Sequence, residues 1–127
     1  MNVVDSSAWL AYFADGPNAG AFAEVVEAPQ DLIVPVITVY EVFKRICQQS
    51  DEKAAYDAVG VMVQSRVVDL TADLAVRAAQ IGREAGLPMA DSLILATARA
   101  HDAVVWTQDA DFDGLEGVRY YPAVGRT

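Results

Sequence analysis

Short apolar runs alternate with amphipathic segments along most of the chain. The apolar runs predict strands at residues 2–4, 32–34, 66–70, 104–107 and 118–121. The amphipathic segments predict helices that run from Ser6 or Ser7 to about Phe13, over residues 19–27, 38–48 and 51–64, from Thr71 to about residue 85, and over residues 90–100. The predicted order is therefore that of strands separated by helices.

The predicted strands are mostly apolar on both faces, which is typical of a parallel sheet covered by helices on both sides. The predicted fold is α/β, a three-layer α/β/α sandwich around a central, mainly parallel sheet. In such sheets the ligand crevice lies outside the carboxyl ends of the strands. Asp5 and Asp109 follow two such ends, and Glu41 and Asp91 lie near the starts of two helices. We therefore expect all four acids on one rim of the sheet.

The length of 127 residues fits a single domain over residues 1–127. A hydrophobic content of 54% supports a packed core. No apolar run approaches the roughly 18 to 20 residues that span a bilayer, and the N-terminus lacks the basic start of a secretory leader. We expect a soluble protein without a membrane partner, located in the cytoplasm.

The single cysteine and the single histidine exclude several kinds of site. Cys47 cannot form an intrachain disulfide or a cysteine-based zinc cluster and is expected to be a buried helix residue. His101 falls near the end of a predicted helix, where a terminal or capping role is commoner than catalysis. No Gly-x-Ser-x-Gly sequence is present, which argues against serine hydrolase chemistry.

The formal charge of −9 argues against a nucleic-acid substrate, because Lys and Arg supply most of the affinity for phosphates. That objection weakens if the acids cluster around Mg²⁺ or Mn²⁺, since the metal reverses the local charge. The basic residues Lys44, Arg45 and Arg99 could reach phosphates, although solvated surface charge is the commoner role of such residues.

Asp5, Asp91 and Asp109 suit a Mg²⁺ or Mn²⁺ site, because these ions take hard oxygen ligands and leave positions for water and phosphate. Glu41 could complete the coordination or orient the attacking water, and the sequence does not separate these roles. Ser6 and Thr107 are candidates for hydroxyl groups that orient the acids, and helix capping explains each almost as well. Metal-assisted phosphodiester hydrolysis is the chemistry that such a site could perform.

Four segments carry a resemblance to the PIN-domain family, and in particular to its VapC-type toxins. These are Met1-Asn2-Val3-Val4-Asp5-Ser6-Ser7-Ala8-Trp9-Leu10, Val36-Ile37-Thr38-Val39-Tyr40-Glu41-Val42, Leu87-Pro88-Met89-Ala90-Asp91-Ser92-Leu93-Ile94-Leu95-Ala96-Thr97-Ala98 and Val105-Trp106-Thr107-Gln108-Asp109-Ala110-Asp111-Phe112. They occur in the family's order and at its usual spacing, and the last two are the more specific.

The resemblance implies an endoribonuclease that depends on Mg²⁺ or Mn²⁺ and halts translation. It implies that Asp5, Glu41, Asp91 and Asp109 are the metal-site acids, to which Asp111 contributes in some members. It also implies a VapB-like antitoxin as the partner and a homodimer. Exposed faces around Phe43, Tyr56 and Met62 are candidates for such contacts, although core packing is the commoner role of each residue type.

Three other classes of protein share some features with this sequence. A phospho-receiver domain would have paired acids after the first strand and a lysine after the last, whereas here a single Asp5 is followed by serines. A haloacid-dehalogenase-type phosphatase would have a second Asp at position 7, where Ser7 stands. A non-catalytic PIN module that binds protein or RNA as a scaffold stays open as an alternative function.

Overall fold

The computed structural model describes residues 1–124. Its strands are β1 (Asn2–Val4), β2 (Leu32–Pro35), β3 (Arg66–Val68), β4 (Val104–Thr107) and β5 (Val118–Tyr120). Its α-helices are α1 (Ser6–Phe13), α2 (Ala19–Val26), α3 (Val36–Gln49), α4 (Glu52–Met62), α5 (Ala72–Ala85) and α6 (Met89–Ala100), and the short 3-10 helices are η1 (Pro29–Asp31) and η2 (Ala110–Phe112). The prediction of one domain over residues 1–127 stays a prediction, and residues 125–127 lie outside the described residues.

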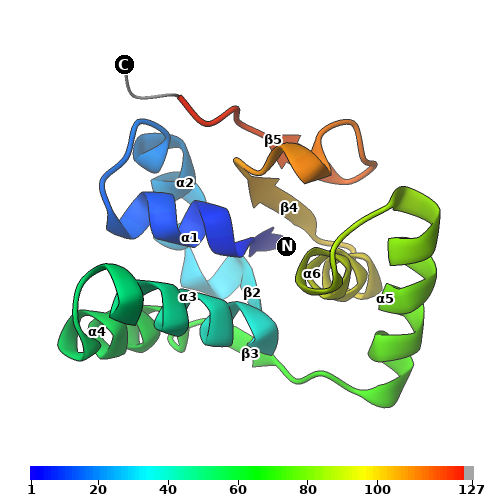
Figure 1. The fold of residues 1–127 in the computed structure, drawn as a ribbon, viewed down its shortest axis with the longest axis horizontal. Helices are drawn as coiled ribbons and strands as arrows, with labels where there is room; N and C mark the ends of the chain where they lie inside the picture. The colour runs from blue at the N-terminus through cyan, green and yellow to red at the C-terminus, as the bar shows by residue number, and fades with distance from the viewer. Residues whose placement is uncertain (125–127) are drawn as a thin grey trace.

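The strands form one sheet in the order β3-β2-β1-β4-β5, and every pairing between them is parallel (Figure 1). β1 lies at the centre, where Val3 pairs with Ile33 of β2 on one side and with Val105 of β4 on the other. A parallel pair needs a crossover connection, and helices supply it. The predicted α/β class with a mainly parallel sheet is confirmed.

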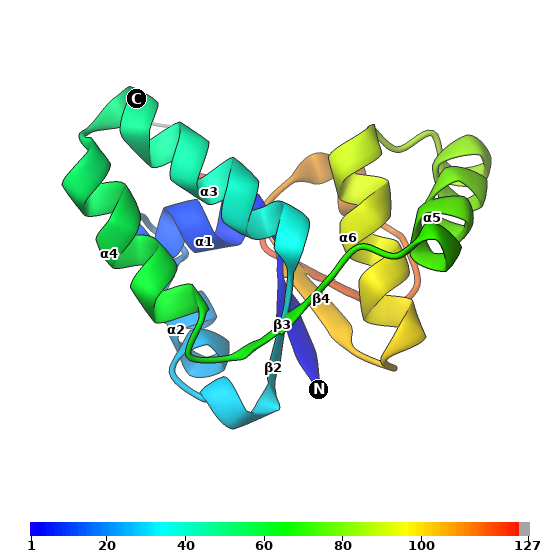
Figure 2. The ribbon, with the colours of Figure 1, turned by 90° about the horizontal axis from the view of Figure 1, so that it is seen from below.

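Helices cover both faces of this sheet and make the predicted three layers (Figure 2). α1 to α4 lie on one face, where Val4 packs in a cluster with Trp9, Phe22 and Trp106. α6 lies on the other face, where Val3 packs with Ile94, and α5 packs on the outer side of α6. Because successive strand residues point to opposite faces, the adjacent residues Val3 and Val4 supply both clusters and are fully buried.

Several local predictions differ from the structure. The strand predicted at residues 66–70 ends at Val68, because β3 is an edge strand in which Arg66 and Val67 are exposed to solvent. Cys47 is half-buried instead of buried, since it lies at the margin of the apolar face of α3. Neither serine caps α1: its N-cap is Asp5, whose carboxylate accepts a hydrogen bond from the backbone N–H of Ala8 at 3.0 Å.

The residues considered for contacts with partners divide between core and surface. Met62 is fully buried, whereas Tyr56 is 62% exposed and packs edge-on against the half-buried Phe43. His101 ends α6 as predicted, and its Nδ1 lies 2.9 Å from the carbonyl oxygen of Thr97. No helix in residues 1–124 has the length and hydropathy that crossing a bilayer requires.

Candidate metal centre

Asp5 is placed by the central strand. Its backbone N–H donates to the carbonyl oxygen of Trp106 at 3.1 Å, so the pairing of β1 with β4 continues to this residue. The backbone then turns into α1, and the Asp5 carboxylate caps that helix. The side chain is 1% exposed. A carboxylate is thereby held beneath the rim of the sheet, at the carboxyl end of β1.

Asp109 is placed by the adjacent strand. It follows β4 by two residues, and its backbone N–H donates to the hydroxyl oxygen of Thr107 at 2.9 Å. Its own carboxylate accepts the backbone N–H of Asp111 at 2.9 Å and caps η2. Because β1 and β4 are parallel neighbours, Asp109 and Asp5 leave the sheet at the same rim.

Asp91 comes from a different part of the fold, the first turn of α6. Gly86 ends α5 with a φ of 69°, in the left-handed region that glycine adopts without strain. At Gly82 a Cβ would lie 3.3 Å from the Cβ of Ser92, so glycine allows the close approach of α5 and α6. The tight turn between the two helices brings the start of α6, and Asp91 with it, to the rim.

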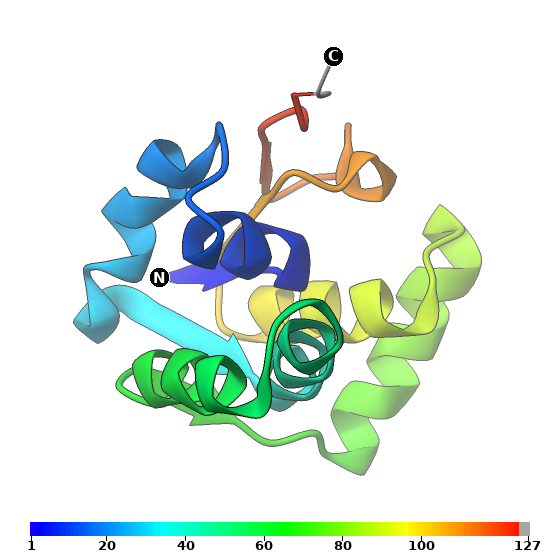
Figure 3. The ribbon, with the colours of Figure 1, turned by 60° about the vertical axis from the view of Figure 1, so that its left-hand side comes forward.

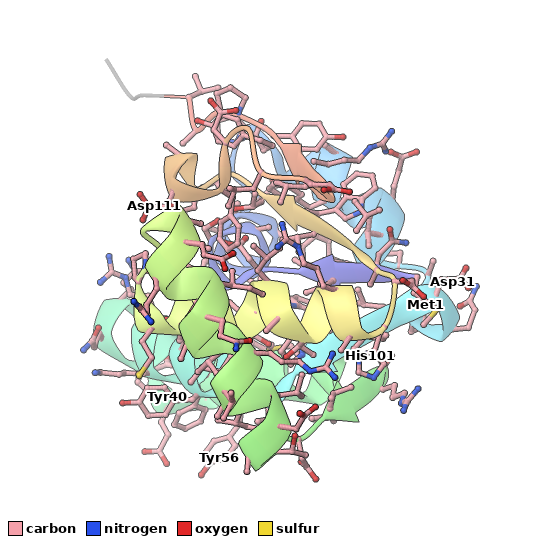
Figure 4. All side chains as sticks on the ribbon, turned by 90° about the vertical axis from the view of Figure 1, so that its right-hand side faces the viewer. Met1, Asp31, Tyr40, Tyr56, His101 and Asp111 are labelled. Atoms are coloured by element: carbon pink, nitrogen blue, oxygen red, sulfur yellow. The ribbon has the colours of Figure 1, made fainter. Side chains whose placement is uncertain are left out.

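These three carboxylates converge. One oxygen from each of Asp5, Asp91 and Asp109 lies within 4.8 Å of the other two. Figure 4 shows the two ends of the sheet through labelled residues. There Asp111 and Tyr40, which follow strands, lie on one side, and Met1 and Asp31, which precede strands, lie toward the other. The expectation that the acids share the carboxyl rim agrees with this geometry.

Glu41 lies beside this group but is not a member of it. It belongs to the second turn of α3, and the hydroxyl of Ser6 donates to its Oε1 at 2.6 Å. This contact joins the start of α1 to α3, which pack side by side (Figure 3). Ser6 therefore orients Glu41 toward the rim, and this geometry fits an acid that positions a water molecule next to a metal ion.

Ser7 is a site residue that the sequence analysis did not single out. Its hydroxyl donates to Asp5, with Oγ 2.8 Å from Oδ1 and 3.0 Å from Oδ2. The same oxygen lies 3.4 Å from the Thr107 hydroxyl and accepts the backbone N–H of Gln108 at 3.3 Å. Ser7 thus links the ends of β1 and β4. The bonds to Thr107 and Gln108 join residues about a hundred positions apart, so no local sequence signal pointed to this role.

The electrostatics of the cluster are those of acids gathered without a cation. Burial raises the pKa of Asp5 from 3.8 to about 6, although hydrogen bonds from Ser7 and Ala8 oppose this. Burial, followed by the negative charges of Asp109, Asp5, Glu41 and Asp111, raises the pKa of Asp91 to about 7. All four other rim acids therefore lie close enough to act on Asp91. The ion pairs formed within residues 1–124 join only residues of α4 and α5.

The donor set fits a hard divalent cation. The three converging side chains offer oxygen atoms only, which Mg²⁺ and Mn²⁺ prefer over the nitrogen and sulfur donors that suit zinc. A divalent cation would also neutralise the mutual repulsion that raises the pKa of Asp91. The carboxylates of Asp91 and Asp109 are half-buried, so a metal held there would remain accessible to a substrate.

Comparison with known proteins agrees with the fold. A PIN domain family model matches residues 3–118. Comparison with curated proteins gave no match. Among solved structures, a toxin–antitoxin complex from Klebsiella pneumoniae is 25% identical with a TM-score of 0.77, over 96% of this chain and 99% of that one.

Two further solved structures resemble the chain in fold. VapC20 of Mycobacterium tuberculosis, a toxin that cleaves the sarcin–ricin loop, is 21% identical with a TM-score of 0.79, over 93% of this chain and 97% of that one. A DNA-bound VapBC from Salmonella typhimurium is 17% identical with a TM-score of 0.71, over 96% of this chain and 98% of that one.

Proposed function

Because the chain belongs to the PIN domain family, whose model matches residues 3–118, we propose that it is a metal-dependent endoribonuclease and the toxin of a VapBC-type toxin–antitoxin pair. The observation that carries this proposal is the convergence of Asp5, Asp91 and Asp109 within 4.8 Å at the carboxyl rim. The likeness to the Klebsiella complex and to VapC20 supports the toxin assignment. Such an enzyme would act in the cytoplasm, where RNA and its partner are present.

In the proposed mechanism Asp5, Asp91 and Asp109 hold Mg²⁺ or Mn²⁺. Such a metal would lower the pKa of a bound water and polarise a phosphoryl oxygen of the substrate. The single hydroxyl proton of Ser7 is shared between the two Asp5 oxygens, which orients the carboxylate and opposes the rise of its pKa. Glu41, oriented by Ser6, accepts a proton from the attacking water or completes the coordination. Asp111 lies nearby and can contribute to the same charge cluster.

Cleavage of labelled RNA tests the proposal. The purified protein is incubated with tRNA and with stem–loop RNAs in the presence of Mg²⁺, of Mn²⁺ or of EDTA. We expect cleavage at discrete sites with either metal and none with EDTA, because the carboxylates alone cannot activate water. Metal-independent cleavage would contradict the proposed mechanism. Binding of RNA without cleavage under all conditions would favour the non-catalytic scaffold instead.

We further propose that the protein is a homodimer and that a VapB-like antitoxin binds it. Exposed apolar side chains on α3 and α4, among them Tyr40 and Tyr56, support a contact between protein surfaces. Light scattering should give twice the 13.6 kDa of one chain for the protein alone. With the product of the adjacent gene we expect a larger complex in which RNA cleavage is lost. A monomer, or a mixture that keeps full activity, would contradict these assignments.

A further inference from the structure

The cationic side chains in residues 1–124 divide into those that have a partner and those that do not. Lys53 pairs with Asp57 and Arg77 with Asp73. Arg99 donates to the carbonyl oxygen of Glu116, and Arg119 and Lys44 lie over aromatic rings. Within this part of the chain the remaining cations are Arg45, Arg66 and Arg83, and all three are exposed. They are the guanidinium groups most available to a ligand.

Arg45 lies beside the acid cluster on one side. It follows Glu41 by four residues on α3, so the two side chains share a face of the helix and their backbones are about 6 Å apart along its axis. That face is the one turned toward the start of α1, because the Ser6 hydroxyl donates to Glu41 at 2.6 Å. Arg45 therefore lies one helical turn beyond Glu41, on a helix of the layer formed by α1 to α4.

Arg83 lies beside the cluster on the other side. It is the basic residue in the last turn of α5, and the turn through Gly86 leads directly into the first turn of α6, which carries Asp91. Gly82 and Ser92 are in close contact. Arg83 is the residue after Gly82, and Asp91 is the residue before Ser92. α5 belongs to the layer opposite α3 (Figure 2). Arg45 and Arg83 thus lie on helices that approach the rim from opposite faces of the sheet.

We propose that Arg45 and Arg83 bind backbone phosphates of the RNA strand on either side of the acid cluster. The inference rests on the proposed ribonuclease function. A chain with a formal charge of −9 repels RNA except where metal and cations gather. Guanidinium groups bind phosphate oxygens in a bidentate manner. Two of them at the ends of the rim would hold a strand across the carboxylates and supply affinity without reading sequence.

Arg66 provides a matched control. It is also an exposed arginine without a partner in residues 1–124, but it begins the edge strand β3, two strands away from β1. The test compares Arg45→Gln, Arg83→Gln and the double variant with Arg66→Gln. Cleavage of labelled RNA at saturating Mn²⁺ gives KM and kcat. Anisotropy of a fluorescein-labelled mixed-sequence RNA oligonucleotide gives the dependence of affinity on salt.

We expect KM to rise about fivefold for each of Arg45→Gln and Arg83→Gln with kcat nearly unchanged, and the slope of log affinity against log salt to fall by about 0.7 per variant. Arg66→Gln should match the wild type. The melting temperatures should stay within about 2 °C of the wild type, because an exposed charge without an ion-pair partner contributes little to stability.

Three results would overturn the inference, and they are distinguishable. If the wild type cleaves RNA and the Arg45 and Arg83 variants match Arg66→Gln in KM and salt dependence, the phosphate contacts are wrong and the ribonuclease stands. If the wild type neither cleaves nor binds any RNA with Mg²⁺ or Mn²⁺, the proposed function fails and this inference fails with it. A fall in kcat alone, at unchanged KM and salt slope, would assign the arginines to another role.

Discussion

Replacement of Asp91 by Asn is expected to reduce metal-dependent RNA cleavage at least about a thousandfold, because one lost carboxylate ligand removes several kcal/mol of charge stabilisation. Asn has nearly the same size, so the first turn of α6 should keep its position. The substitution also removes a group whose pKa burial and the neighbouring acids together raise to about 7. The variant should therefore be at least as stable as the wild type when metal is absent.

The matched control is Asp113→Asn, which removes an exposed acid from the segment that follows η2. This variant should cleave RNA at the rate of the wild type. Circular dichroism spectra and melting curves in EDTA establish that both variants are folded. Wild-type activity in folded Asp91→Asn would remove this residue from the proposed site. Equal losses in both variants would point to a general charge effect.

The stability of the metal-free protein is expected to fall as pH rises. The raised pKa values, about 6 for Asp5 and about 7 for Asp91, mean that the folded state binds protons more tightly than the unfolded state does. Their contribution is fully present below about pH 4 and is lost as pH rises through 6 and then 7. For the buried Asp5 the shift of about two units corresponds to about 3 kcal/mol.

Melting curves in EDTA should therefore show a fall of roughly 10 °C between about pH 5 and about pH 8. Saturating Mn²⁺ should reduce this fall, since the metal favours the ionised carboxylates. The metal-induced rise in melting temperature is thus expected to be small at low pH and large at high pH.

Asp5→Asn isolates the contribution of the buried acid. Asn keeps the side-chain oxygen that caps α1 but cannot ionise. The difference in stability between wild type and variant at each pH contains no contribution from other groups whose titration the substitution leaves unchanged. We expect the variant to lose less stability with rising pH in EDTA and to gain less from Mn²⁺. The same pH dependence in both proteins, or the same shift with metal, would show that Asp5 neither carries the raised pKa nor binds the ion.

The order of elements and the sheet were predictable from local patterns. Val3 and Val4 belong to a short apolar run that is typical of a buried strand, and residues 39, 42, 43 and 46 repeat with a helical period. Boundaries were less predictable where tertiary contacts decide them. β3 is shorter than its apolar run because it pairs on one side only. The cap of α1 is Asp5 and not a serine, since the strand ends at the residue before it.

The four acids were recognised from sequence through their positions at strand ends and helix starts and through the family resemblance. Those positions did not show which of the four acids lie close together in space. Asp5, Asp91 and Asp109 converge within 4.8 Å, whereas Glu41 stands beside them in a hydrogen bond with Ser6. The link that Ser7 makes between the Asp5 carboxylate and the end of β4 joins residues about a hundred positions apart.

The sequence by itself determined that strands and helices alternate, and a parallel sheet then places every strand end on one rim. The alternation is a local property, because the spacing of apolar residues within a segment indicates whether that segment is a strand or a helix. The tertiary structure alone decided which acids meet and how deeply Asp5 is buried. These depend on β1 lying next to β4 and on the tight turn from α5 to α6. Distance and burial arise from packing between segments that are remote in the chain, and no local pattern encodes them.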